Sequence, residues 1–95
     1  MTSDGAGEAV RRRRAKFRAW HRGMREVDLI LGRFADAHLD RLSEPDLAAF
    51  EALLGASDPE VLGWVTGEWA VPPDRDSPFL RRLIAFNRDG SGGPR

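Results

Sequence analysis

The chain has 95 residues, 41% of them apolar and 32% charged, a composition typical of one folded domain. It has no cysteine, which excludes disulfides, thiolate zinc sites and cysteine nucleophiles. The net charge is zero, yet it is +5 over residues 1–33, −8 over 34–76 and +3 over 77–95. No apolar run approaches the ~20 residues that span a membrane, and no apolar leader is present, so we expect a cytoplasmic protein.

The small polar residues 1–7 predict a disordered N-terminus. A single helical domain is then expected over residues 8–88, followed by a flexible glycine-containing tail over 89–95. The first helix is predicted over about residues 8–21, and Gly23 stands where a glycine commonly ends a helix. Its predicted apolar stripe consists of Val10, Phe17 and Trp20, with Ala15 alongside.

The second helix is predicted over about residues 24–38, because its apolar positions recur with helical spacing. Its predicted core face comprises Val27, Ile30, Leu31, Phe34 and His38. Ser43 is expected to cap a third helix that ends at Gly55. Asp58 is expected to cap a fourth helix, with Pro59 at its first position, which ends at Gly67.

A linker is predicted over residues 71–74, because two consecutive prolines cannot continue a helix. The last helix should open at Ser77 and Pro78. It carries Phe79, Leu80, Leu83, Ile84 and Phe86 as its apolar residues. No alternating β-branched run of useful length is present. The sequence therefore predicts an all-α fold, a compact bundle of about five short helices.

Residue chemistry gives little support to catalysis. The two histidines, His21 and His38, fall in helical segments, and no nucleophile turn accompanies them. Neither histidine belongs to a cluster of metal ligands, and His38 is expected at the edge of the core. We therefore expect a protein that is not an enzyme and has no metal and no cofactor of its own.

Two kinds of binding protein remain. Arg11–Arg14, Lys16 and Arg18 form a basic run with aromatic neighbours, which suits a small nucleic-acid-binding helical protein. Against this alternative, the chain has a pI of about 6.7 and an acidic middle, so we expect no nucleic-acid partner. A protein-binding module is favoured, since two arginines, two carboxylates and a histidine surround one glycine at residues 20–28. These residues could equally serve only to cap two helices.

The sequence R-G-M-R-E at residues 22–26 resembles the R-G-x-x-E motif of the small FAD assembly factors of the SdhE type, also called succinate dehydrogenase assembly factor 2. The likeness continues through V-D-L-I-L at 27–31 and includes D-P-E-V-L-G-W at 58–64. It covers roughly residues 11–88.

This resemblance implies a five-helix protein that binds the flavoprotein subunit of succinate dehydrogenase, or of fumarate reductase. Such a factor promotes covalent attachment of FAD to a histidine of its partner and is expected to be a monomer without a membrane segment. The resemblance makes Arg22, Gly23 and Glu26 the partner-binding residues. The flanking residues His21, Arg25 and Asp28 are further candidates.

Overall fold

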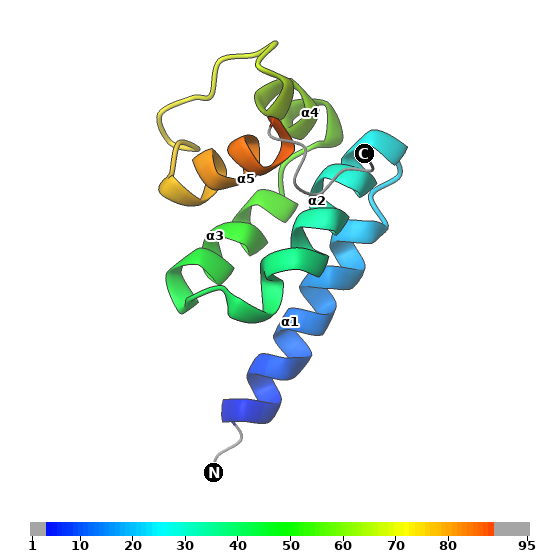
Figure 1. Cartoon of the computed structure of the whole chain (residues 1–95), viewed down its shortest axis with the longest axis vertical. Helices are drawn as coiled ribbons and strands as arrows, with labels where there is room; N and C mark the ends of the chain where they lie inside the picture. The colour runs from blue at the N-terminus through cyan, green and yellow to red at the C-terminus, as the bar shows by residue number, and fades with distance from the viewer. Residues whose placement is uncertain (1–3, 89–95) are drawn as a thin grey trace.

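The computed structural model describes residues 4–88, which form an all-α bundle as predicted (Figure 1). In chain order its elements are α1 (Asp4–Trp20), α2 (Arg25–His38), the short 3-10 helix η1 (Leu39–Arg41), α3 (Glu44–Leu54), α4 (Asp58–Thr66) and α5 (Pro78–Arg88). No helix among these residues is both long and apolar enough to cross a bilayer. The tail predicted over 89–95 lies outside the described residues.

The first helix differs most from expectation. α1 begins at Asp4 and therefore includes residues 4–7, which the sequence predicted to be disordered. Residues 1–3 lie outside the described part of the chain. The predicted apolar stripe of α1 is wrong at two positions, because Val10 is 38% exposed and Phe17 is 63% exposed. Ala15 is buried and Trp20 half-buried, as expected.

Small side chains form the contact that α1 makes with the core. Ala15 and Ala19, four residues apart, are buried, with 2% and 0% of their surfaces exposed. On the facing helix α2, Gly32 is covered by the indole of Trp20, which a Cβ at Gly32 would approach to 2.3 Å. The alanines let the two helices pack closely, and the large side chain of Trp20 is accommodated because it lies over a glycine. Phe17 lies on a different, exposed face of α1.

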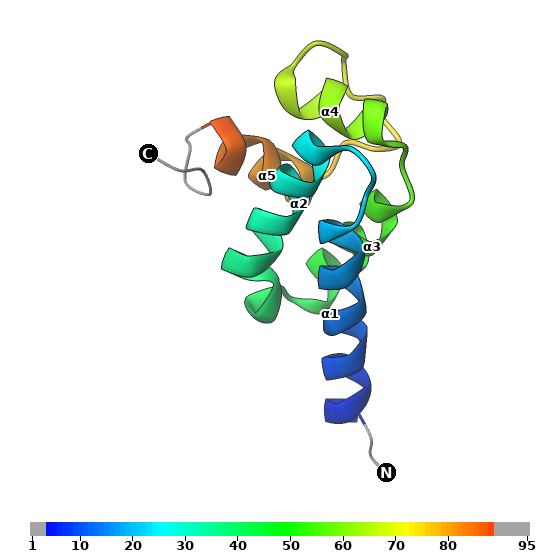
Figure 2. The ribbon, with the colours of Figure 1, turned by 90° about the vertical axis from the view of Figure 1, so that its right-hand side faces the viewer.

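The two views of the ribbon show α1 and α2 as an antiparallel hairpin joined by a short corner (Figures 1 and 2). α1 also contacts α3, while α2 contacts both α4 and α5. The core lies among α2, α3 and α5, where Phe34 makes edge-on contacts with Phe79 and Phe86, with ring centroids 5.4 and 5.3 Å apart. This packing fixes α2, and thereby the corner at its start.

Capping residues set the helix starts, with one correction. Ser43 caps α3 as predicted, since its side chain accepts a hydrogen bond from the backbone N–H of Asp46. The cap of α4 is Ser57 and not Asp58. Ser57 and Glu60 form a reciprocal capping box, in which each side chain accepts from the other's backbone N–H. Asp58 is therefore left free to bind another group.

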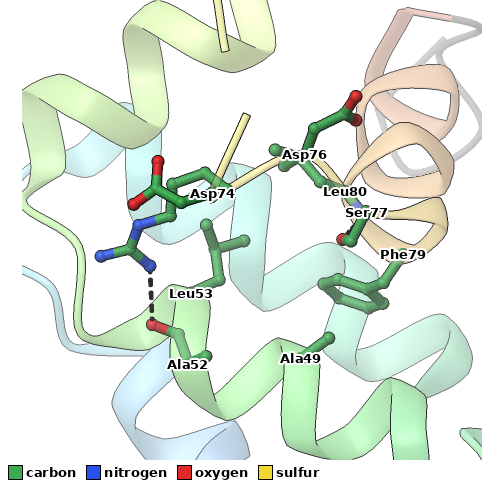
Figure 3. A pocket seen from close by; sticks show the side chains of 9 residues that line it. Ala49, Ala52, Leu53, Asp74, Asp76, Ser77, Phe79 and Leu80 are labelled. Atoms are coloured by element: carbon green, nitrogen blue, oxygen red, sulfur yellow. Dashed lines mark hydrogen bonds between the residues drawn. The ribbon is translucent and has the colours of Figure 1, made fainter. Parts of the chain in front are cut away.

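The segment between α4 and α5 is non-helical around its two prolines, as predicted. It passes beside α3 and encloses a small hollow of about 190 Å³ with α3 and the start of α5 (Figure 3). Arg75 fastens the segment by donating to the carbonyl oxygen of Ala52 at 3.2 Å. Its guanidinium also lies 5.7 Å from the centre of the Trp64 ring. This hollow is lined by none of the predicted site residues.

Candidate functional site

The corner between α1 and α2 is built around one glycine. Gly23 has φ of +105°, a left-handed conformation that side chains disfavour. A Cβ there would meet only Asp58 Oδ2, at 3.9 Å, which is ordinary contact. The requirement for glycine within this chain therefore comes from the backbone conformation, as the helix-ending position predicted, and not from crowding.

Arg22 points inward from the corner. Its Nε donates to Asp58 Oδ1 at 2.8 Å, and its two terminal nitrogens donate to the carbonyl oxygens of Leu54 and Ala56. Its side chain is only 11% exposed. The carbonyls belong to the end of α3 and the turn after it, and Asp58 opens α4. Arg22 therefore ties the corner to the junction between α3 and α4 through a fork of charge-assisted hydrogen bonds.

Asp28 also faces the corner. Its Oδ1 accepts a hydrogen bond from the backbone N–H of Arg22 at 2.7 Å, and the residue is half-buried. A carboxylate in the first turn of α2 thus holds the backbone of the preceding corner. Arg22, Gly23 and Asp28 together make the corner rigid, and the two charged side chains are directed toward the protein.

The remaining predicted site residues face solvent. His21, Arg25 and Glu26 are exposed. Among the residues that the structure describes, no side-chain hydrogen bond or ion pair of Glu26 or Arg25 is found. A carboxylate and a guanidinium at the start of α2 are thus held on a rigid corner with their bonding capacity unused.

His21 stacks on an aromatic neighbour. Its ring lies 3.9 Å from that of Phe17, with 17° between the ring planes. Its Nδ1 lies 2.7 Å from the Phe17 carbonyl oxygen, a contact that needs the proton on Nδ1. The stack extends the exposed surface of the corner back along α1.

The roles of two residues in this region differ from those predicted from the sequence. The prediction of Asp58 as a helix cap is wrong, because the S-x-x-E pattern from Ser57 to Glu60 is the signature that identifies Ser57 as the cap. Phe17 was assigned to the core because it lies three residues from Trp20. The signal against this was the alanine pair at 15 and 19, which marks a different face of the helix.

Half of the basic run is engaged in contacts with the protein itself. Arg11 donates hydrogen bonds to Glu51 and Glu44. These bonds raise the pKa of its guanidinium, and the bond to Glu51 has the larger effect. Arg12 donates to the carbonyl oxygen of Leu42 at 3.0 Å and pairs with a glutamate of α1. Lys16 lies 3.3 Å from Asp36. Three of the six basic side chains are therefore engaged by the protein itself, which weakens the nucleic-acid alternative.

Comparison with known proteins shows which family the chain matches. Residues 13–87 match the family described as flavinator of succinate dehydrogenase. The matched range includes the whole corner and all of α2, α3 and α4.

Individual relatives agree with this match. The chain is 40% identical over 85 residues to the FAD assembly factor SdhE of Acetobacter pasteurianus, covering 90% of this chain and 78% of the relative. It is 46% identical over 68 residues to the FAD assembly factor SdhE of Legionella pneumophila strain Lens, covering 72% and 80%. Succinate dehydrogenase assembly factor 2, mitochondrial, of Komagataella phaffii is 30% identical over 96 residues, and there the match spans 97% of this chain but half of the relative.

Proposed function

The chain belongs to the family of flavinators of succinate dehydrogenase, and on that premise we propose that it is an assembly factor that promotes covalent attachment of FAD to that enzyme. The binding partner we propose is the flavoprotein subunit of succinate dehydrogenase, or of a fumarate reductase. The relatives named FAD assembly factor, which match over most of their own length, support this proposal.

The observation that carries the proposal is that some charged side chains of the corner bond within the chain while another is exposed. Arg22 and Asp28 bond within the chain, and Glu26 is presented to solvent close beside them. A rigid support with an unused charged group favours binding, because little conformational freedom is lost when the partner docks. In this proposal Glu26 accepts hydrogen bonds from the partner, Arg25 and His21 lie at the edge of the contact, and Arg22, Gly23 and Asp28 hold the corner in shape.

The proposed mechanism is positional. Bond formation between a protein side chain and a flavin requires the two to be held close together in the correct orientation. A factor that binds preferentially to the partner conformation with this alignment raises its population and so the rate. The chain would contribute shape and charge without a catalytic residue or a cofactor of its own, acting as a monomer. The good match to bacterial relatives supports a cytoplasmic site of action.

Co-purification tests the binding step. The tagged chain is expected to retain the flavoprotein subunit, and Glu26→Ala to weaken retention by at least ~30-fold, because removal of one partner of a buried charge contact costs about 2–5 kcal/mol. Glu68→Ala is the matched control, since Glu68 is also exposed and its side chain bonds no described residue. Equal retention of the wild type and both variants would show that Glu26 is not in the contact.

A further inference from the structure

One face of α1 is unexpectedly apolar for a surface. The only large hydrophobic side chains exposed among the described residues are Val10, Phe17 and Trp69. Val10 and Phe17 lie seven residues apart, two helical turns along the same face. Arg14 falls on this face too, and Arg18 borders it. His21, just beyond the end of α1, continues it by stacking on Phe17. We call these five residues the α1 stripe.

The arginines of the α1 stripe form no ion pair within residues 4–88. Arg11, Arg12 and Lys16 of the same helix each form an ion pair. Arg14 and Arg18, in contrast, are exposed and form no ion pair with any described residue. Cations beside exposed apolar side chains are complementary to a surface on which carboxylates border an apolar residue.

The surface is hollowed on both sides of Arg18. One hollow, of about 250 Å³, is lined by Val10 and Arg14 together with Glu51 of α3. The other, of about 170 Å³, is lined by Phe17 and His21. Arg18 lines both, so the two adjoin along α1. The second hollow also touches Arg22, and therefore reaches the corner that carries Glu26.

We propose that the α1 stripe is a second part of the docking surface, which receives an acidic segment of the flavoprotein subunit with an apolar side chain placed against Phe17. This inference rests on the proposed function and extends the contact from the corner along α1. It also orients the partner, because carboxylates of the partner face Arg14 and Arg18 while a donor faces Glu26. Residues outside the R-G-x-x-E motif thereby contribute affinity.

Binding of purified variants to the purified flavoprotein subunit at low and high salt tests the inference. Phe17→Ala is expected to weaken binding about 10–100-fold at both salt concentrations, since a buried aromatic contact is lost. Arg18→Glu is expected to weaken it about tenfold or more at low salt, mainly through a slower association rate, and less at high salt. Thermal unfolding of both variants should match the wild type, because both side chains are exposed.

Arg88→Glu is the matched control. Arg88 is exposed and is the last residue of α5. Figure 2 shows the end of α5 on the opposite side of the ribbon from α1, so reversal of this charge should leave binding within about twofold of wild type. Binding that is lost with Glu26→Ala but unchanged with Phe17→Ala would overturn the inference and leave the proposed function standing. No binding by the wild type would overturn both. A wild-type dimer that Phe17→Ala dissociates, or Phe17-dependent binding to single-stranded DNA at physiological salt, would assign the stripe to a different partner.

Discussion

Two arginines three residues apart act on opposite sides of the corner. Arg22 is folded inward against Asp58 and two carbonyl oxygens, whereas Arg25 is exposed and unbonded among the described residues. The guanidinium fork of Arg22 donates to three acceptors at once. In the proposed contact, Arg22 therefore holds the shape of the corner from which Glu26 is exposed.

Replacing each of the two arginines by alanine should change the stability of the fold by different amounts. Arg22→Ala is expected to destabilise the fold by about 2 kcal/mol or more, because it leaves Asp58 and two carbonyls with fewer partners. Arg25→Ala should change stability by less than about 0.5 kcal/mol, as exposed side chains usually do. Urea unfolding followed by circular dichroism measures both. Equal midpoints for the two variants would contradict the inward role of Arg22.

At this scale the sequence predicted the local features and missed the distant ones. The left-handed backbone of Gly23 was predicted from its place after a helix, although α1 ends three residues earlier than Gly23, at Trp20. The orientation of Arg22 could not be predicted, since its partner Asp58 is 36 residues away and was itself assigned to a cap. Which residues of a motif support it and which remain free depends on tertiary contacts.

At the scale of elements, the cap of α3 and the break before α5 were predicted from sequence, whereas the cap of α4 and the buried face of α1 were not. Ser43, Gly55 and the two prolines before α5 act within a few residues, so their effect is visible locally. The face of α1 is chosen by how closely α2 approaches. Alanine and glycine allow that approach, and hydrophobicity alone does not predict it.

The contact between Gly32 of α2 and Trp20 of α1 predicts that alanine at position 32 destabilises the fold, whereas alanine at a control glycine stabilises it. Gly32→Ala should destabilise the protein by about 1–3 kcal/mol, because its Cβ would displace the Trp20 indole. Gly7→Ala, also within a helix but with nothing within 4 Å of the new Cβ, should stabilise it by up to about 1 kcal/mol. Thermal midpoints measure both changes, and a Gly32→Ala protein as stable as wild type would refute the close contact.

At the scale of the whole molecule, the segregated charges meet in ion pairs at the surface, between neighbouring helices. The basic N-terminal helix pairs with acids of α3 and α2, as Arg11 does with Glu44 and Glu51 and Lys16 does with Asp36. The net charges of +5 and −8 read from the sequence are thus partly neutralised across the α1–α3 contact. A zero net charge with a few unpaired cations suits an oriented protein contact better than a polyanion.

Stability should fall in mild acid because of His38. Its ring lies between Phe34 and Phe86, with centroids 5.0 and 5.2 Å away. Burial, then the charges of Arg82 and Arg41, lower the pKa of His38 from its ordinary 6.5. The unfolded chain therefore binds the proton first, so the free energy of unfolding falls as pH drops through 6.5 and levels off below the folded pKa.

Urea midpoints measured between pH 5 and 8 would show this loss, and His38→Leu should abolish it. A His38→Leu protein whose stability has an unchanged slope between pH 5.5 and 6.5 would assign the effect to another group.

A separate loss of stability is expected at lower pH, because Arg11 and Arg81 lower the pKa values of Glu44 and Asp76. Those two carboxylates contribute stability above their ordinary pKa values, and this stability is lost as pH falls through the lowered values.

The most direct test of the account is the rate at which purified apo-flavoprotein subunit acquires covalent FAD with and without this chain, seen as flavin fluorescence on a denaturing gel. We predict that the wild type and Glu68→Ala raise the rate by at least about tenfold, and that Glu26→Ala returns it close to the rate without the chain. An equal rate with and without the chain would contradict the proposed function. Equal acceleration by Glu26→Ala and Glu68→Ala would contradict the assignment of the corner as the contact.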